Sequence, residues 1–408
     1  MRWTSGLFLL GLAVPALAAG LAGILNLQDA DVIPGKYIVS LRPEADAALH
    51  LSWVRDVHRR SLSRRGGSST AGLEKTYGFG DFSAYAGEFD DETIMQILRS
   101  ENVLHVEADR AAYLTSVQQQ TDAPWGLEAL SSRSRVSDGS TQGYTYTYDS
   151  SSGEGTFAYV LDSGVLTNNS EFGGRAVKGY NAWDGTESFD DHFGHGTHVA
   201  GTIASNTYGV AKKATVIDVK VVRSVGYSTV AHVLDGINWA VNNATRTPGR
   251  AGKSVINMSL AFTTSSTLNA AVDAASAMGI LSVVSAGNDN ADASTRSPAS
   301  ASTALTVGAV HQNRTRASFS NYGSRVAVFA PGVDVASLWN VEGVVSVSSG
   351  TSMSSPYVAG LALYLKGLEA GLDSPAATVA RVRKLAVADV VADAGRGSPN
   401  LLAYNGIA

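Results

Sequence analysis

The sequence predicts an α/β protein in which helices flank a parallel β-sheet on both faces, preceded by a small α+β unit. From residue 125 onward, continuous apolar runs of strand length alternate with helical patterns, as in parallel sheets that are buried on both sides. Before residue 115, shorter strand-like runs surround one short helical pattern. The 408 residues include 44% hydrophobic residues and 42 glycines, which suits two or three domains with a large core and many turns.

Residues 1–18 have the pattern of a secretory signal peptide. Arg2 supplies positive charge, residues 7–14 are apolar, and Ala16-Leu17-Ala18 forms a small-x-small cleavage site. The apolar run is too short to span a bilayer, and no other stretch is long enough. We therefore expect a secreted, extracellular protein with no membrane partner.

Charge and cysteine content exclude several classes of protein. The net charge is -5, and no basic tract is interleaved with aromatic residues, so we expect no nucleic-acid partner. There is no cysteine, which excludes disulfides, thiol catalysis and thiolate metal sites. We expect a monomer that depends for stability on its core, its tight turns and any ions that it binds.

The small unit is predicted to contain three strands and a helix, at residues 36–41, 82–89, 103–107 and 91–98. The polar sequence that leads from the first strand through residues 64–69 predicts an exposed loop. Weak periodicity and three consecutive glutamines predict a linker at residues 115–123.

The larger part has six predicted strands, at residues 156–161, 215–222, 254–260, 280–286, 304–310 and 326–330. Helical patterns lie between several of them, at residues 199–205, 230–241 and 268–278. Ligands of such sheets bind beyond the carboxyl ends of the strands, so reactive side chains are expected there.

Ser352 stands at the start of a predicted helix. The positions after it are apolar on opposite faces, which predicts a helix buried on all sides, and Pro356 is expected in its first turn. Free backbone N–H groups and the helix dipole at this end suit an attacking oxygen and the oxyanion that its attack creates. The alternative interpretation of Ser352 is an ordinary N-cap serine.

Three further residues lie at strand ends or helix starts. Asp162 follows an apolar strand and either completes a turn or orients a histidine. His195 is flanked by glycines, which allow a bound chain to approach closely. Asn288 follows another apolar strand and is either a turn residue or a hydrogen-bond donor to an oxyanion. His192 and His198 share a short stretch with His195, but it lacks the His pair and Glu of a zinc-peptidase helix, so we expect no metal and a structural role for His198.

The order of the candidate residues distinguishes the possible classes of hydrolase. An α/β-hydrolase needs Gly-x-Ser-x-Gly and a later histidine, but Ser354 replaces the second glycine and no histidine follows His311. A pepsin-type enzyme needs two Asp-Thr/Ser-Gly segments, and only Asp162 supplies one. The order Asp, His, Ser remains, which is that of the subtilisin triad.

Three sequence blocks, 160–164, 194–202 and 350–356, together resemble the signatures of subtilisin-like serine peptidases. Four other segments resemble the proteinase K-like branch of secreted fungal enzymes, at residues 123–127, 297–300, 318–323 and 400–405. The resemblance covers nearly the whole chain after the signal. It implies a subtilisin-like fold, a ferredoxin-like inhibitory prodomain and serine endopeptidase activity without a catalytic cofactor.

The resemblance also implies the roles of the site residues. Ser352 would be the nucleophile that forms an acyl-enzyme, His195 the general base and then acid, and Asp162 the residue that orients the imidazole. Asn288 and the Ser352 N–H would form the oxyanion hole. An extended peptide substrate would lie between two edge strands, one with Ser259, Leu260 and Ala261 and the other with Gly226 and Tyr227. Ala286 and Gly287 would line the pocket for the residue before the cleaved bond.

The chain departs from the family pattern in a few places. Ala261-Phe262 stands where Gly-Gly is usual, so we expect narrowed or reshaped pockets. Ser354 replaces an alanine and Tyr357 a histidine. Ala327 replaces the aspartate that anchors a calcium ion in proteinase K, so a structural calcium remains possible but that site is expected to be lost.

Residues 34–117 resemble the family's inhibitory prodomain, and residues 118–408 its peptidase domain. We expect the prodomain to act as an intramolecular inhibitor and the chain to cleave itself near Val117. The main alternative is a catalytically impaired homologue that binds peptides in a reshaped cleft. An exopeptidase is a third possibility, although no cleft-blocking insertion is evident.

Overall fold

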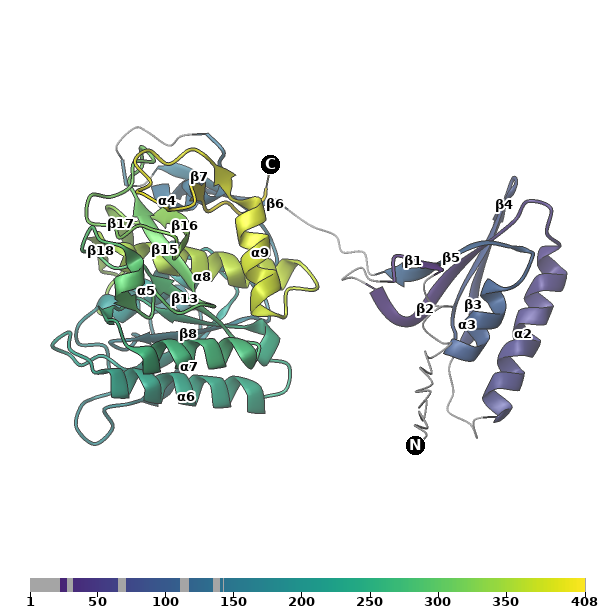
Figure 1. Cartoon of the computed structure of the whole chain (residues 1–408), viewed down its shortest axis with the longest axis horizontal. Helices are drawn as coiled ribbons and strands as arrows, with labels where there is room; N and C mark the ends of the chain where they lie inside the picture. The colour runs from purple at the N-terminus through teal and green to yellow at the C-terminus, as the bar shows by residue number, and fades with distance from the viewer. Residues whose placement is uncertain are drawn as a thin grey trace, which may run out of the picture. The chain divides into compact units, whose positions relative to one another are not determined.

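The computed structural model describes residues 23–27, 32–64, 71–110, 117–134, 140–141 and 143–407. The chain divides into two compact units, Met1–Leu114 and Thr115–Ala408 (Figure 1). The predicted signal peptide lies outside the described residues. Among the helices that are described, none is long and apolar enough to cross a membrane.

In its described residues, the first unit is a five-stranded sheet with two helices, which matches the α+β prediction. Its strands are in the order β1-β5-β2-β4-β3, and β2 pairs antiparallel with both β4 and β5. Its elements are β1 (Ile24–Leu25), β2 (Val32–Leu41), α2 (Ala47–Arg64), β3 (Gly72–Phe79), β4 (Phe82–Glu88), α3 (Asp91–Leu98) and β5 (Val103–Arg110).

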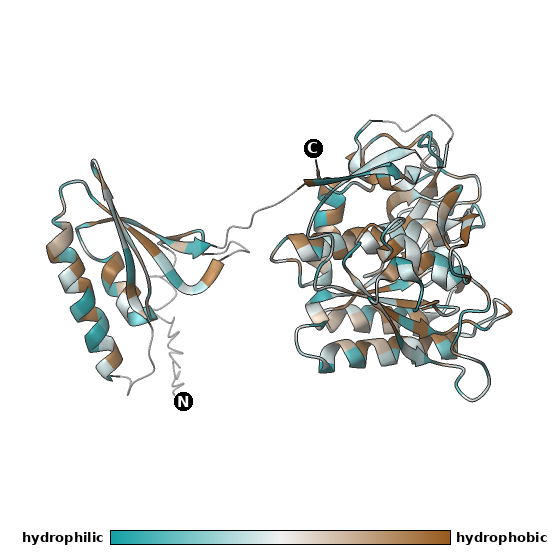
Figure 2. Cartoon of the chain, turned by 180° about the vertical axis from the view of Figure 1, so that it is seen from behind, coloured by the Kyte–Doolittle hydropathy of each residue, from teal (hydrophilic) through white to brown (hydrophobic). Residues whose placement is uncertain are grey.

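Helix α2 corrects the prediction of an exposed loop. Its buried side chains recur at helical spacing, but two histidines and a serine are among them; they are His50, Val54, Val57, His58 and Ser61. Because three of these five positions are polar, the apolar periodicity is weak in the sequence. Figure 2 shows the mixture of hydrophobic and hydrophilic residues along this helix.

The second unit is built on a nine-stranded sheet in the order β19-β20-β16-β15-β13-β11-β8-β10-β9. Every neighbouring pair is parallel except β19 with β20. The strands are β8 (Phe157–Asp162), β9 (Ala176–Asn181), β10 (Thr215–Lys220), β11 (Ser254–Met258), β13 (Leu281–Ser285), β15 (Leu305–Val310), β16 (Val326–Pro331), β19 (Val387–Ala388) and β20 (Leu401–Leu402).

Helices cover both faces of this sheet, as predicted (Figure 1). Helices α6 (Val230–Arg246) and α7 (Ser266–Ala277) pack on one face, and α5 (His195–Ala204) and α8 (Thr351–Leu368) pack on the other. Helix α8 is buried on all sides, also as predicted, because it crosses behind several strands. The remaining elements are α4 (Trp125–Ser131), α9 (Pro375–Leu385), the pair β12 (Phe262–Thr263) and β14 (Arg296–Ser297), the pair β17 (Val335–Leu338) and β18 (Val345–Ser348), and three short 3₁₀ turns at Ser170–Phe172, Ala251–Lys253 and Ala293–Thr295.

The predicted linker is wrong for the part that the structure describes. Residues Val117–Ala123 form strand β6, which pairs antiparallel with β7 (Tyr144–Asp149). The strand is polar and largely exposed, so it has no alternation of apolar and polar residues that could identify it in the sequence.

Candidate active site

Sheet topology places three of the predicted site residues at the carboxyl ends of neighbouring strands. Strands β8, β11 and β13 are adjacent and parallel, so their carboxyl ends lie together. Asp162 ends β8, Ser259 directly follows β11, and Asn288 comes three residues after β13. Helices α5 and α8 begin at His195 and Thr351 and pack against each other.

Asp162 and His195 are in direct contact. His195 Nδ1 lies 2.8 Å from Asp162 Oδ1, and the same oxygen accepts a hydrogen bond from the Ser163 N–H at 2.7 Å. The side chain of Asp162 is 3% exposed and that of His195 is 24% exposed. The carboxylate is therefore buried behind an imidazole whose other nitrogen is available on the solvent side.

The environment of His195 favours its protonated form. Burial lowers the pKa of this imidazole, but the charge of Asp162 and its hydrogen bond raise it, and the charge of Asp191 raises it further. The balance puts the pKa of His195 above its ordinary value of 6.5. A base of this kind is neutral, and able to accept a proton, only on the alkaline side of that raised pKa.

Ser352 is the second residue of α8 and the only residue of this helix before Gly367 that is not fully buried. Its Oγ donates to the Ser259 carbonyl at 3.2 Å, and Ser259 lines the same pocket as His195 and Asp162. Ser352 is therefore linked through Ser259 to the pocket that Asp162 and His195 line, and its hydroxyl is directed to the Ser259 carbonyl.

Pro356 is not in the first turn of α8, contrary to prediction, because the helix begins at Thr351 and the proline is its sixth residue. A proline has no N–H, so the carbonyl of Ser352, four residues earlier, lacks its helical partner. Ser259 Oγ donates to this carbonyl at 2.8 Å instead. Asn257 Nδ2 in turn donates to Ser259 Oγ at 3.1 Å, so a side-chain network supports the backbone of the nucleophile candidate.

Asn288 is exposed, and its amide is oriented by Thr351. Its Oδ1 accepts hydrogen bonds from the Thr351 N–H at 2.9 Å and from Thr351 Oγ1 at 2.8 Å, which directs Nδ2 the other way. A Cβ atom placed on Gly350 would lie 3.4 Å from Asn288 Nδ2 and 3.6 Å from the Ser352 nitrogen. The two donors therefore flank one small space beside Ser352.

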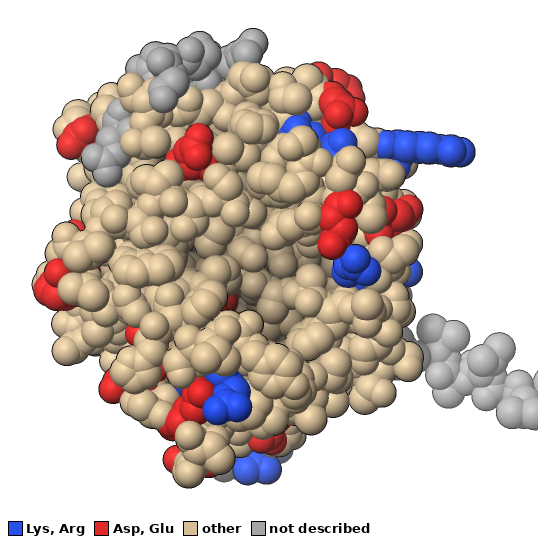
Figure 3. Space-filling view, turned by 90° about the vertical axis from the view of Figure 1, so that its left-hand side faces the viewer, with Lys and Arg blue, Asp and Glu red and all other residues tan. Residues whose placement is uncertain are grey.

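A pocket of about 390 Å³ adjoins His195. It contains the predicted substrate residues Gly226, Tyr227, Ser259, Leu260 and Ala261. Its other walls include Phe193, Val222 and Phe262, and Asp162 and His195 also line it. Figure 3 shows the side of the larger unit on which α5 and β18 lie in Figure 1: it is hollowed near the middle, and most charged side chains stand away from the hollow.

Two details of the predicted cleft differ in the structure. Gly226 and Tyr227 form a turn, closed by hydrogen bonds with Arg223, and residues 259–261 lie between β11 and β12, so neither segment is a strand. Gly226 has φ +75°, which breaks an extended path. Ala286 is fully buried and Gly287 is held by Asn321, so neither lines this pocket.

Asp191 was not identified in the sequence, although it organises the start of α5. Its carboxylate accepts hydrogen bonds from the Gly194 N–H at 2.8 Å, from Thr197 N at 2.9 Å and Oγ1 at 2.6 Å, and from Ser163 Oγ at 2.9 Å. Ser163 Oγ also accepts from the Gly196 N–H at 3.0 Å. Because Asp191 lies in a polar segment with no recognisable pattern, only its contacts reveal it.

His198 is structural, in keeping with its predicted role. It is buried, and its Nε2 lies 3.1 Å from the Val335 carbonyl and 3.2 Å from that of Ser346. Burial lowers the pKa of His198 to about 4, although the hydrogen bond to Val335 opposes the shift. Within the described ranges, no group of three His, Asp or Glu side chains is placed to hold a metal ion.

The surroundings of Ala327 do not suit a calcium ion. Ala327 lines a second pocket whose other lining residues include Arg325, Arg383 and Lys384 but no Asp or Glu. Calcium is a hard cation that binds carboxylate and carbonyl oxygens, and cationic side chains oppose it.

Comparisons with known proteins identify the family. Residues 153–402 match the model of the subtilase family, and residues 36–115 match that of the peptidase inhibitor I9. Alkaline protease 1 of Aspergillus flavus is 48% identical and that of Emericella nidulans is 49% identical, each with 98% of both chains covered. The subtilisin-like proteinase Mp1 of Magnaporthiopsis poae is 46% identical, with the same coverage.

A solved structure is also similar. A cold-adapted subtilisin-like serine proteinase has 38% sequence identity and a TM-score of 0.62, and the match covers 70% of this chain and 99% of that one. The family match exceeds half of the chain, and these relatives match 98% of its length. The chain therefore belongs to the subtilase family, as a subtilisin-like serine endopeptidase that carries an inhibitor I9 segment ahead of its peptidase domain.

Proposed function

We propose that this endopeptidase cleaves peptide bonds through an acyl-enzyme formed on Ser352. The observation that carries the proposal is the contact between buried Asp162 and His195 in the pocket that Ser352 adjoins through Ser259. Because Asp162 occupies Nδ1, the Nε2 of His195 is left to accept the serine proton. The Ser352 hydroxyl turns from the Ser259 carbonyl to His195 when substrate is bound, since such contacts often tighten only in the complex.

The reaction then proceeds in two halves. Ser352 Oγ bonds to the peptide carbonyl carbon as its proton moves to His195, and Asp162 stabilises the imidazolium. The carbonyl oxygen, now negative, lies between Asn288 Nδ2 and the Ser352 N–H. The carbon–nitrogen bond breaks as His195 protonates the leaving amine, and a water molecule then releases the acyl group by the same route.

A covalent probe tests this assignment. A fluorophosphonate is expected to label Ser352 and to abolish casein hydrolysis in parallel with labelling, and Ser352→Ala should remove the label. The alternative, a peptide-binding homologue without catalysis, requires no labelling and no hydrolysis. Labelling of a different serine, with activity lost, would reject Ser352 as the nucleophile.

The pocket walls suggest a restricted substrate preference. Phe193, Tyr227 and Phe262 are aromatic, and Phe262 and Ala261 add side chains beside Leu260. We propose that the cleft prefers uncharged, apolar side chains and is narrower than the broad cleft of proteinase K. A peptide-library cleavage profile should broaden when Ala261 and Phe262 are both changed to glycine; an unchanged profile would reject their role.

We also propose that the chain is secreted as a zymogen with a prodomain at residues 34–117, and that it cleaves itself near Val117. The inhibitor I9 match and the exposed position of Val117, which begins β6, support this. The full chain with Ser352→Ala should stay uncut in a protease-free host, while the unaltered chain is processed and exported. Cleavage of the variant at the same place would show that another protease performs it.

A further inference from the structure

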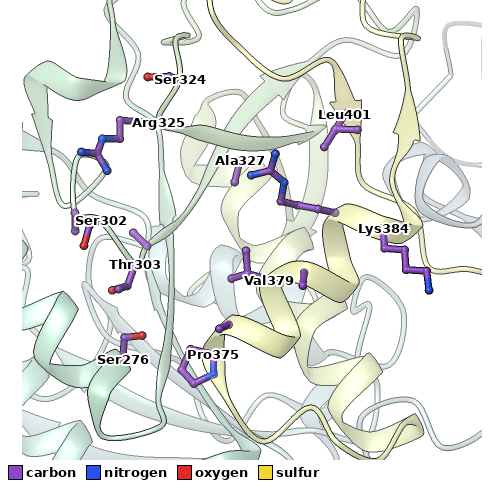
Figure 4. Close-up of a pocket in the computed structure, with 15 residues that line it drawn as sticks. Ser276, Ser302, Thr303, Ser324, Arg325, Ala327, Pro375, Val379, Lys384 and Leu401 are labelled. Atoms are coloured by element: carbon purple, nitrogen blue, oxygen red, sulfur yellow. The ribbon is translucent and has the colours of Figure 1, made fainter.

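The second unit has another, larger pocket of about 830 Å³ (Figure 4). It lies among the end of α7, the segment before β15, the start of β16, helix α9 and β20. It shares no lining residue with the pocket beside His195. Its size is within the range of about 300–1,000 Å³ that is usual for small-molecule sites.

The charged lining of this pocket is entirely positive. Arg325, Arg383 and Lys384 belong to it, and no Asp or Glu does. All three side chains are exposed, and within the described part of the chain no ion pair is formed by any of them. In the view of Figure 4, Arg325 and Lys384 stand on opposite sides, with Ala327 and Val379 between them.

One carboxylate lies just behind this surface, and its hydrogen-bonding capacity is used. Asp273 accepts hydrogen bonds from Thr303 N at 2.9 Å, from Thr303 Oγ1 at 2.7 Å and from Ser302 Oγ at 2.9 Å. Burial raises the pKa of Asp273, but these hydrogen bonds lower it below its ordinary value. As an anion, Asp273 therefore holds Ser302 and Thr303 in the wall of the pocket. Its single negative charge is outweighed by the three positive charges of the lining residues.

The floor of the pocket is apolar. It consists of small or branched aliphatic side chains, among them Ala304, Ala327, Val379 and Leu401. A single inorganic ion would leave this floor uncovered, whereas a ligand with an apolar body would bury it. Guanidinium groups bind phosphate, sulfate and carboxylate with paired, charge-assisted hydrogen bonds.

We propose that this pocket binds a small organic anion. Its phosphate, sulfate or carboxylate group pairs with Arg325 and Arg383, and its apolar body covers Ala327 and Val379. The site is separate from the peptide cleft, so a bound anion stabilises the second unit without competing with substrate.

Calorimetric titration with phenyl phosphate tests the proposal. The protein is first treated with a sulfonyl fluoride to prevent autolysis, and inorganic phosphate and phenol serve as comparison probes. Phenyl phosphate should bind more tightly than either, and its affinity should fall at least about tenfold in the double variant Arg325→Gln/Arg383→Gln. Arg246→Gln, at an exposed arginine at the end of α6, makes the same type of substitution elsewhere, with the loss of one positive charge instead of two, and should leave the affinity unchanged.

Each opposite outcome overturns the proposal. If phenyl phosphate shows no saturable binding, or binds the double variant with equal affinity, the cations are solvated surface groups. If inorganic phosphate binds with the same affinity as phenyl phosphate, the apolar floor contributes nothing. If the double variant does not fold, the salt dependence of phenyl phosphate binding to the unaltered protein is the test. An affinity that is unchanged between roughly 0.01 M and 1 M NaCl would exclude pairing of the phosphate with the arginines.

Discussion

The pocket beside His195 and the pocket over Ala327 differ in a way that is informative about catalysis. The pocket beside His195 has less than half the volume of the pocket over Ala327, about 390 Å³ against about 830 Å³. The smaller one contains a buried carboxylate bonded to an imidazole, with a serine at a helix start beside it. The larger one contains cations that have no carboxylate partner among the lining residues. Contact between ionisable groups, rather than volume, therefore distinguishes the pocket proposed for catalysis from the pocket proposed for anion binding.

Removal of the serine hydroxyl should have the largest effect. Ser352→Ala is expected to lower kcat/KM by about 10⁴-fold or more, because the remaining groups have no nucleophile to activate. Hydrolysis of a chromogenic peptide amide measures this. Ser354→Ala is the matched control: its hydroxyl is buried and has no hydrogen-bond partner in the described structure, so activity should be kept. An equal loss in both variants would contradict the assignment.

Asn288→Ala should have the next largest effect. Loss of one oxyanion donor is expected to lower kcat by about 10²–10³-fold, the range for such a donor in a subtilisin, with little change in KM. Steady-state kinetics on the same peptide separates the two constants. A rise in KM with kcat unchanged would mean that Asn288 binds the ground state of the substrate instead.

Asp191 should act on the reaction through His195. Asp191→Asn removes a charge that raises the pKa of His195 and weakens the hydrogen bonds at the start of α5. We expect kcat/KM to fall by roughly 10–10²-fold, since small displacements of a catalytic group are costly. Because the pKa of His195 falls, its neutral form persists to lower pH, and the acid limb of the pH profile should move to lower pH.

Asp190→Asn is the control for that variant. It makes the same charge change one residue away, on a side chain that is 72% exposed, where ion pairs contribute little. The pH profile of kcat/KM for Asp190→Asn should be the same as that of the unaltered enzyme. If both variants shift the acid limb equally, the effect is one of general surface charge rather than of the Asp191 contacts.

The smallest effect concerns the backbone of Ser352. Ser259→Ala removes the donor to the Ser352 carbonyl and should lower the free energy of unfolding by about 1–3 kcal/mol, the usual cost of a buried polar group left unpaired. In a Pro356→Ala background, the new N–H of residue 356 can donate to the Ser352 carbonyl. The loss of unfolding free energy caused by Ser259→Ala should therefore be smaller. Denaturant unfolding of the four proteins with Ser352 blocked measures this coupling. Equal costs in both backgrounds would disprove it.

Much of the fold could be predicted because its signals are local. The strands that became β8, β11 and β13 are continuous apolar runs, and α8 is apolar on every face, so both are visible in the sequence. Glycine-flanked His195 and the strand-end Asp162 also carry local signals. The three blocks in their order were sufficient to identify the family.

Elements that depend on particular contacts rather than on apolar periodicity were missed or misplaced. Helix α2 buries histidines, strand β6 is polar and depends on β7, and Gly226 and Tyr227 turn back on Arg223. In each case a contact remote from the residue, or a local turn with no apolar pattern, outweighs the periodicity that a sequence displays.

The sequence by itself determined the subtilase family, the parallel sheet and the identities of Asp162, His195, Ser352 and Asn288 as candidates, because residue type and order carry that information. Only the tertiary structure decided their partners: Asp191 at the start of α5, Thr351 on Asn288, and Ser259 in place of the hydrogen bond that Pro356 cannot make. It also placed cations around Ala327. The physical reason is that hydrogen bonds and charges act over a few ångströms in space. Thr351 and Asn288, and Ser259 and Ser352, are separated by tens of positions along the chain, whereas Asp191 is near Gly194 in the chain but lies in a segment without a recognisable pattern.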